Sequence, residues 1–296
     1  METSFCLRVD IDTWEGLERG VPMCLKLAEE NSFPITFYLS LGKYATGRNL
    51  FRIIKDREPI KRKIPVWKRN HWKDLFRGVL TPSKRINDNL IGLLRDYETS
   101  QYCEIHPHGY NHVRWANSFN QFNEHQTSEY VNRMIREYTR IFEKSPVANA
   151  APNFVTNSFY TKLLSEKKFK FTSDYIYHSP FILSSDGGIK PKGRVIVQLP
   201  VTEYSIEDLI VQGKSKTEII KFYKYKFEKH VEEGSSYICM YIHAIFEPIR
   251  MYKVLEEIIK ITESLDIKPL THSEYYNQEK NLPIKELKEI HQEMQK

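Results

Sequence analysis

Two stretches, FCLRVDID at residues 5–12 and ITFYL at residues 35–39, decide the fold class. Both are rich in aliphatic, aromatic and β-branched residues, which is typical of buried strands. Between them, Gly20-Val21-Pro22 opens a segment whose apolar residues recur with helical spacing, and proline suits the first turn of a helix. The order strand, helix, strand is the repeating unit of a parallel α/β sheet.

The same alternation continues to residue 270. Helices are expected over 86–97, 128–144, 158–167, 216–231 and 252–264, and strands over 102–106, 147–151, 169–173, 194–200, 237–243 and 267–270. There is no internal repeat and no linker rich in Pro, Gly or Ser, so one domain is favoured over two. We predict a single α/β barrel over residues 1–275, followed by a polar C-terminal tail at 276–296. The loop 184–193, SSDGGIKPKG, is expected to be a surface excursion.

Composition excludes several classes of protein. With 41% hydrophobic and 13% aromatic residues, the chain is too apolar to be disordered. The longest nearly uncharged apolar run, residues 237–246, is much shorter than the ~20 residues that cross a bilayer. The first twelve residues carry acids where a secretory signal needs a basic start, so we expect a cytoplasmic protein. The four cysteines form no C-x-x-C pair and are expected to be reduced core residues: Cys6, Cys24, Cys103 and Cys239.

The net charge of +6 is concentrated in one segment. Between Arg48 and Arg77 there are eleven basic and three acidic residues, a local charge of +8, which leaves the rest of the chain slightly acidic. Large apolar side chains, among them Trp67 and Trp72, lie between the cations. Such a mixture suits an anionic and partly apolar surface, as a membrane offers. Nucleic acid is a second interpretation, and a solvated basic surface is a third.

Polar residues follow several of the predicted strands. In α/β barrels the functional groups gather at the carboxyl ends of the strands. The first strand ends in Asp10-Ile11-Asp12, where the period of two puts both carboxylates on one face. The strand at 102–106 leads into His108 and His112, and the strand at 237–243 ends in His243. Asp174 follows the strand at 169–173.

Two carboxylates on one face of an apolar strand repel each other unless a cation or a proton lies between them. A metal ion resolves the repulsion. One Asp oxygen and two imidazole nitrogens form a three-ligand site that leaves a position open for water, as hydrolytic Zn²⁺ requires, and such a site also accepts Co²⁺, Ni²⁺ or Mn²⁺. The remaining Asp is then a candidate base and a histidine from another strand a candidate acid.

Each motif alone is common, so other interpretations stay open. Asp10-x-Asp12 is also the pattern with which a glycosyltransferase holds a metal and a nucleotide diphosphate. That interpretation leaves His108, His112 and His243 without a role. A barrel that binds a lipid phosphate or nucleic acid without catalysis is the other alternative.

Taken together, the motifs resemble the polysaccharide deacetylase superfamily, also called the NodB-homology or carbohydrate esterase 4 superfamily. The closer resemblance is to the branch that deformylates 4-formamido-arabinose on undecaprenyl phosphate during lipid A modification. The matching segments, in the family's order, are LRVDIDTWEGLERGVPMCLKL, ITFYLSLGKYATGRNLFRIIK, HGYNHVRW, AAPN, SDY, QLPVT and IHA. They span about residues 5–270. A related enzyme that deacetylates undecaprenyl-phosphate-linked N-acetylhexosamine fits equally well.

The resemblance implies an irregular (β/α)7 barrel and metal-dependent hydrolysis of an N-acyl group on a lipid-linked sugar. Carried over position by position, Asp10 is the base, and Asp12, His108 and His112 are the metal ligands. His243 is the acid, and Asp174 is the carboxylate that orients it.

The substrate that the resemblance implies gives the basic segment, about residues 43–85, a role. It becomes an insertion that docks on the anionic inner face of the membrane and binds the phosphate, and nucleic acid is no longer expected. Arg48 and Arg52 are expected nearest the phosphate, and Asn153 is assigned to substrate binding.

Three departures from the family pattern bear on the sugar pocket. The Arg-x-Pro motif whose arginine pairs with the base in most of the superfamily is replaced by Ala150-Ala151-Pro152-Asn153. Phe154 and Val155 stand where the deformylase branch carries a Trp and an Arg nearby. Ile245 follows the late His-Ala, where that branch has an acid. The acyl group, acetyl or formyl, therefore stays open.

Overall fold

A computed structural model describes residues 2–44, 82–184, 195–279, 281–286 and 289–290. Residues 45–81, which include Arg48 and Arg52 of the predicted insertion, lie outside the described residues, as does most of the predicted excursion at 184–193.

The strands form two sheets. The first has the order β3 (Cys103–Pro107), β2 (Ile35–Leu39), β1 (Ser4–Ile11), β8 (Tyr237–His243), all parallel, and β9 (Lys268–Pro269) also pairs with β1. The second has the order β10 (Ile284–Glu286), β6 (Phe181–Ser184), β7 (Ile196–Gln198), β5 (Phe171–Thr172), β4 (Ala148–Asn149). In the second sheet the β6–β7 pair is antiparallel.

Backbone hydrogen bonds join the two sheets on both sides. The Ala150 amide donates to the Pro107 carbonyl at 3.1 Å, which links β4 to β3. The Thr202 and Glu203 amides donate to the Cys239 carbonyl at 2.9 and 3.0 Å, which links the chain after β7 to β8. These contacts close β1, β2, β3, β4, β5, β7 and β8 into an irregular barrel, so the predicted α/β fold class is confirmed.

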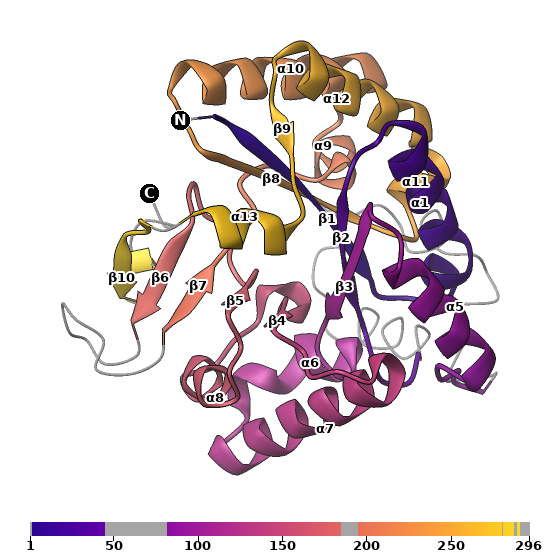
Figure 1. The fold of residues 1–296 in the computed structure, drawn as a ribbon, viewed down its shortest axis with the longest axis vertical. Helices are drawn as coiled ribbons and strands as arrows, with labels where there is room; N and C mark the ends of the chain where they lie inside the picture. The colour runs from indigo at the N-terminus through magenta and orange to yellow at the C-terminus, as the bar shows by residue number, and fades with distance from the viewer. Residues whose placement is uncertain (1, 45–81, 185–194, 280, 287–288, 291–296) are drawn as a thin grey trace.

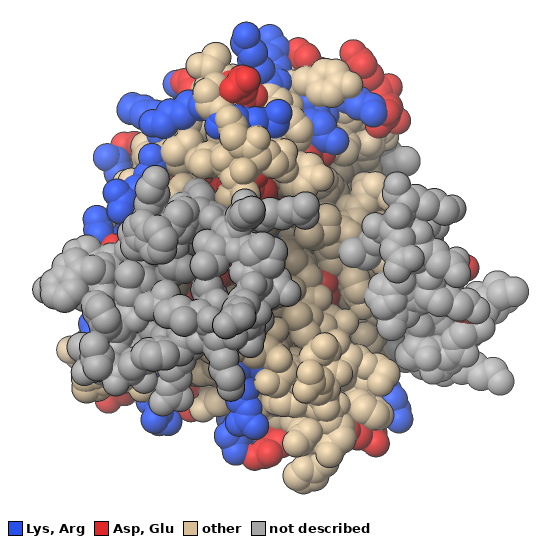
Figure 2. Space-filling model, turned by 180° about the vertical axis from the view of Figure 1, so that it is seen from behind, with Lys and Arg blue, Asp and Glu red and all other residues tan. Residues whose placement is uncertain are grey.

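Helices surround the barrel (Figure 1). The longer ones are α1 (Val21–Glu30), α5 (Asp88–Glu98), α7 (Glu124–Phe142), α10 (Lys216–Glu232) and α12 (Tyr252–Ser264). The shorter ones are α6 (His112–Ser118), α8 (Tyr160–Glu166), α9 (Ile206–Val211), α11 (Glu247–Arg250) and α13 (His272–Gln278). Reciprocal side-chain caps, Asn123 with Gln126 on α7 and Ser215 with Glu218 on α10, satisfy backbone donors at the helix starts. Over α10 and α12, at the top of Figure 2, basic and acidic side chains are mingled.

Strand β1 is buried along its whole length, but its two faces differ in chemistry. Leu7, Val9 and Ile11 belong to the large apolar cluster that also contains the buried faces of the helices. Arg8 and Asp10 alternate with them and are also buried. Because successive side chains point to opposite faces of a strand, the outer face of β1 supplies hydrophobic packing and the inner face brings charge into the barrel.

The structure differs from the sequence prediction at two strands. Strand β6 was not predicted, and the predicted polar tail contributes β10, which pairs with β6 in parallel. Ile290 is fully buried against Tyr175, Tyr177 and Phe181. A few apolar residues, such as Leu282 and Ile290, suffice to dock this otherwise polar stretch, and so short a pattern gives no clear period.

Two expectations about the chain's chemistry can be compared with the structure. All four cysteines are buried and free, as predicted for reduced core residues. No helix among the described residues combines the length and the hydropathy that crossing a bilayer requires.

Gly20 offers a direct test of how α1 is seated. A Cβ at this position would collide with the backbone oxygen of Ala244, which directly follows β8. Gly20→Ala should therefore lower the free energy of unfolding by about 1–3 kcal/mol in urea titrations. Gly92→Ala is the matched control, because a Cβ at this position on α5 meets open space. This substitution should raise the free energy of unfolding by up to about 1 kcal/mol, since alanine favours a helix more than glycine does. Equal stability of the two variants would contradict the close packing at Gly20.

Candidate functional site

The strand register brings the polar residues to one end of the barrel. Asp10 on β1 is in register with Tyr38 on β2 and with His243 on β8. Tyr38 is in turn in register with His106 on β3, two residues before His108. Because the strands are parallel, the residues that follow them, including Asp12, emerge at the same end.

Asp12, His108 and His112 form the centre of the site. The Asp12 Oδ1 atom lies 3.3 Å from His108 Nε2 and 3.4 Å from His112 Nε2. One ligand atom from each of the three residues lies within 4.8 Å of the others. His108 continues directly from β3, and His112 is the first residue of α6, so a four-residue turn aims both rings at Asp12.

The protonation of this group suits a metal ion. His108 donates its Nδ1 proton to the Ala150 carbonyl at 2.9 Å, since a carbonyl only accepts, so its Nε2 can present a lone pair toward Asp12. Burial lowers the pKa of His112 to about 4 despite the nearby Asp12, so this ring is neutral near pH 7. The Asp12 Oδ1 atom is buried without a hydrogen-bond donor. A buried carboxylate oxygen facing two ring nitrogens is the arrangement that a divalent cation satisfies.

Asp10 is paired with an arginine from its own strand. Arg8 Nε donates to Asp10 Oδ1 at 2.7 Å and Arg8 Nη2 donates to Asp10 Oδ2 at 2.8 Å, a bidentate pair buried inside the barrel. Although burial alone would raise the pKa of Asp10, the charge of Arg8 and its hydrogen bonds to the carboxylate hold it below its usual value. The arginine missing from the segment 150–153 thus has a counterpart two residues before Asp10.

His243 lies between two carboxylates. Its Nε2 faces the metal group, 3.9 Å from Asp12 Oδ2, and its Nδ1 lies 3.2 Å from Glu207 Oε2. Glu207 is on α9, and its side chain is largely buried. The sequence assigned the role of orienting His243 to Asp174, but the structure places Glu207 beside this ring.

Asp174 is buried elsewhere in the site. Its Oδ1 accepts a hydrogen bond from the Ala151 amide at 2.7 Å, which fixes the turn that also carries the Ala150 carbonyl. Burial raises the pKa of Asp174 to about 6, although hydrogen bonds from Thr172 and Ala151 oppose this. Its contacts are therefore with the segment after β4 rather than with His243.

Glu247, at the start of α11, completes the surroundings of His243. Its Oε2 accepts from the His243 amide at 2.8 Å and its Oε1 accepts from the Glu207 amide at 3.1 Å. Burial raises the pKa of Glu247 to about 7, with the charge of Glu207 adding to the shift. Glu207, His243 and Glu247 also have ligand atoms within 4.8 Å of one another. Because both Glu247 oxygens already accept backbone amides, we interpret this group as a clamp on His243.

Asn153, which was predicted to bind substrate, is less closely connected to this centre. Asn153 is exposed on the turn after β4, with a left-handed backbone (φ 53°) that asparagine tolerates. Its neighbour Phe154 contacts the Tyr241 ring edge-on, with centroids 5.6 Å apart, and lies 5.0 Å from the Arg8 guanidinium.

Three residues of the site were missed in the sequence: Arg8, Glu207 and Glu247. The signal for Arg8 was present, since the period of two places it on the same face as Asp10 and Asp12. Glu207 carries no such local signal, because it reaches His243 from α9, which follows another strand, whereas Glu247 lies four residues after His243 and opens the next helix, α11.

No family model matches the chain. The chain is 22% identical over 260 residues to a probable 4-deoxy-4-formamido-L-arabinose-phosphoundecaprenol deformylase from Shewanella sediminis, covering 87% of this chain and 80% of the relative. It is 24% identical over 249 residues to the probable enzyme of the same name from Wigglesworthia glossinidia brevipalpis, covering 83% of each.

Solved structures agree in fold. A probable polysaccharide deacetylase from Pseudomonas aeruginosa superposes with a TM-score of 0.62 at 16% identity, covering 93% of this chain and 89% of the other. A family 4 acetyl xylan esterase from Clostridium thermocellum, solved with a cobalt ion, superposes with a TM-score of 0.50 at 12% identity, covering 93% and 91%. The chain thus has the fold of the polysaccharide deacetylases and is similar in sequence to the formamido-arabinose deformylases, as the motifs on its strands predicted.

Proposed function

We propose that the protein is a metal-dependent N-deacylase that removes a formyl or acetyl group from an amino sugar linked to undecaprenyl phosphate. The observation that carries the proposal is the convergence of Asp12, His108 and His112 on one point, with Asp10 and His243 beside it. The names of the curated relatives support the substrate class.

In this proposal Asp12, His108 and His112 hold the ion, for which Zn²⁺ is the first candidate and Co²⁺, Ni²⁺ or Mn²⁺ are alternatives. When bound, such an ion supplies a Lewis acid that polarises the amide carbonyl. The hydrogen bond from His108 to Ala150 fixes that ring's orientation, as the outer partners of metal-binding histidines commonly do.

Asp10 is the proposed base. Arg8 keeps its carboxylate ionised and fixes its plane, while Oδ2 lies 3.7 Å from His108 Nε2, at the edge of the metal group. From there Asp10 can accept a proton from the attacking water, and a carboxylate with a lowered pKa remains ionised at neutral pH.

His243 is the proposed acid. Its Nδ1 lies toward Glu207 and its Nε2 toward the centre of the site, so a proton on Nε2 can pass to the departing amine nitrogen. Glu207 would stabilise the charged imidazolium and fix its orientation, which is the role that a carboxylate plays in hydrolytic triads. The product is a sugar with a free amine, for use in lipid A or envelope modification.

The cellular setting belongs to the same proposal. A lipid-linked substrate places the enzyme at the cytoplasmic face of the inner membrane, held peripherally by the basic insertion. Each Lys or Arg near an anionic leaflet contributes about 1 kcal/mol. Arg48 and Arg52 keep their proposed place near the phosphate, and Asn153 its place near the sugar.

The two alternatives explain less of the geometry. A glycosyltransferase that holds a nucleotide through Asp10 and Asp12 does not require the two histidines at 3.3 and 3.4 Å from Asp12. A barrel that only binds lipid phosphate does not require an acid histidine backed by Glu207.

The deciding experiment is mass spectrometry of synthetic prenyl-phosphate N-formyl and N-acetyl sugars after incubation with zinc-loaded protein. We expect loss of the acyl group from one of the two substrates and none after chelation of the metal. In Asp10→Asn, we expect turnover to fall by about 100-fold or more, as loss of a general base does. Intact substrates in every reaction would contradict the proposal.

Metal binding can be measured without activity. We expect about one zinc per chain by elemental analysis of reloaded wild-type protein, and a clear loss in Asp12→Asn and His112→Ala. His125→Ala is the matched control, because His125 is exposed on α7 and outside the group. Equal zinc content in His112→Ala and His125→Ala would overturn the ligand assignment.

Glu207 and Asp174 can be separated by paired amide variants. Glu207→Gln should lower kcat by about 100-fold with little change in KM, because the amide no longer stabilises the charged His243 ring. Asp174→Asn should have a much smaller effect on kcat. The opposite order would restore the role that the sequence assigned to Asp174.

Asp174 should also make the stability of the folded protein depend on pH. Because the pKa of Asp174 is raised to about 6 from the ordinary 3.8, the folded state binds the proton more tightly than the unfolded state. The contribution of Asp174 to stability is therefore full at low pH and falls as pH rises from about 4 to about 6. In urea titrations, the free energy of unfolding of Asp174→Asn, relative to that of the wild type, should rise by on the order of 3 kcal/mol between pH 4 and pH 7. A difference independent of pH would contradict this.

A further inference from the structure

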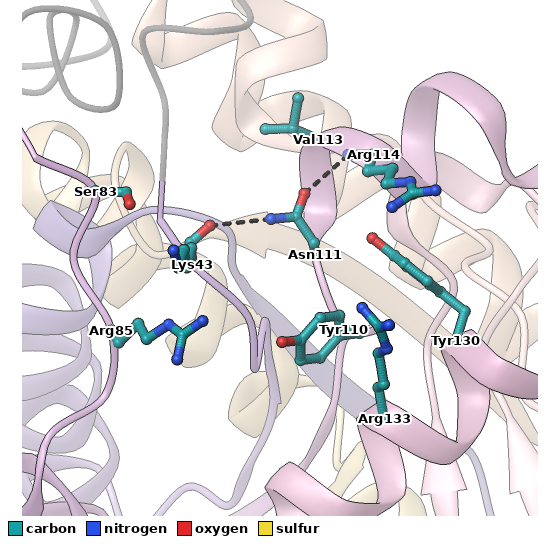
Figure 3. Close-up of a pocket in the computed structure, with 9 residues that line it drawn as sticks. All are labelled: Lys43, Ser83, Arg85, Tyr110, Asn111, Val113, Arg114, Tyr130 and Arg133. Carbon is teal, nitrogen blue, oxygen red and sulfur yellow. Dashed lines mark hydrogen bonds between the residues drawn. The ribbon is translucent and has the colours of Figure 1, made fainter.

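A basic pocket opens beside the candidate metal group. Its volume is about 260 Å³, and the described residues that line it include four cations and no carboxylate: Lys43, Ser83, Arg85, Tyr110, Asn111, Val113, Arg114, Tyr130 and Arg133. Figure 3 shows the Arg85 guanidinium and the Tyr110 hydroxyl pointing toward the middle of this pocket. A concave surface with several cations and neutral donors is suited to a compact anion.

The pocket shares a wall with the metal group. Asn111 and Val113 line it, and they are the immediate chain neighbours of His112. Neighbouring Cα atoms are about 3.8 Å apart, so the pocket begins one residue from a proposed metal ligand. The pocket and the metal group are therefore neighbours along the start of α6.

Two of the cations are held opposite each other. Tyr44 and Lys84 form an antiparallel bridge in which each amide donates to the other's carbonyl, at 2.9 and 3.3 Å. This pairing sets Lys43 directly opposite Arg85. Like charges at such positions destabilise the pair unless an anion lies between them. Among the described residues, no carboxylate is within ion-pair distance of either side chain.

The other two cations are positioned by their surroundings. The Arg114 guanidinium lies 5.5 Å from the ring centroids of both Phe122 and Tyr130, a cation–π arrangement that restrains it while leaving its donors available. Arg133, one turn along α7 from Tyr130, is paired with Glu129.

Asn111 joins the two walls of the pocket. Its Nδ2 donates to the Lys43 carbonyl at 3.1 Å, and its Oδ1 accepts from the Arg114 amide at 2.9 Å (Figure 3).

We propose that this pocket binds the phosphoryl group of the prenyl-phosphate carrier while the N-acyl group lies at Asp12, His108 and His112. The proposal rests on the proposed function and adds four cations, Lys43, Arg85, Arg114 and Arg133, to the residues proposed there to lie near the phosphate. Arginine is well matched to phosphate because its fork of donors can bind two oxygens at once. The pocket thereby selects a phosphate-linked sugar over a free one.

Binding is tested with farnesyl phosphate, a short soluble prenyl phosphate, by calorimetry on the metal-loaded protein. We expect binding that weakens as the salt concentration rises. The Kd should increase by about 10- to 100-fold in Arg85→Gln and in Arg114→Gln, since a charge-assisted hydrogen bond contributes about that factor. Arg136→Gln is the matched control, because Arg136 is exposed on the same helix as Arg133 and does not line the pocket. Farnesyl phosphate binding in Arg114→Gln equal to that in Arg136→Gln would overturn the proposal.

Kinetics separate this proposal from the proposed function. The kcat/KM for a farnesyl-phosphate-linked N-acyl sugar, divided by that for the methyl glycoside of the same sugar, should fall by about 10- to 100-fold in Arg114→Gln and less in Arg114→Lys. If neither sugar is deacylated by wild-type protein, the proposed function fails while the binding test of the pocket still stands. If Arg114→Gln loses binding only to anionic vesicles without prenyl phosphate, and its substrate ratio is unchanged, the pocket is a membrane contact and the proposal fails.

Discussion

The structure depends on how charge is carried into the barrel on the inner face of β1. Arg8, Asp10 and Asp12 alternate with Leu7, Val9 and Ile11, so the strand that supplies the hydrophobic packing also carries three ionisable groups inward. Burying a carboxylate without a partner costs several kcal/mol. Asp10 is compensated by Arg8, whereas Asp12 faces the Nε2 atoms of His108 and His112. The two carboxylates of one strand therefore have different partners, which is why we propose Asp10 as the base and Asp12 as the metal ligand.

This arrangement also accounts for the departures from the family pattern. In most of the superfamily the arginine that pairs with the base comes from an Arg-x-Pro motif, yet here the segment Ala150–Asn153 carries none. Arg8 supplies the partner from β1, and Phe154 lies 5.0 Å from its guanidinium. The acid expected after the late His-Ala is absent at Ile245, but Glu247 reaches the backbone of His243 from α11. Electrostatic roles are thus retained in the site while the chain positions that supply them differ.

The sequence was most informative where one local pattern determines the outcome. Strands β2 and β8 and helix α12 begin and end where their apolar patterns predicted, and a period of two correctly placed Asp10 and Asp12 on one face. The meeting of Asp12 with His108 and His112 followed from the rule that parallel strands end together. What was missed depends on contacts between distant segments: Glu207 reaches His243 from α9, and β10 pairs with β6 only after a further hundred residues. Asp174 was assigned to His243 by resemblance, and the structure ties it to Ala151 instead.

The bridge between Tyr44 and Lys84 has a consequence for how such an enzyme can diversify. It pairs the two residues that flank the stretch 45–83, so the positions of these two residues on the barrel do not depend on the sequence between them. Closing a longer loop adds little free energy, only about 0.6 kcal/mol for each doubling of length. The intervening sequence can therefore be lengthened, shortened or replaced during evolution without moving Asp10, Asp12 or the histidines. The proposed docking of this stretch on the membrane and the proposed hydrolysis of the amide are in this way separable traits, free to change at different rates in one gene.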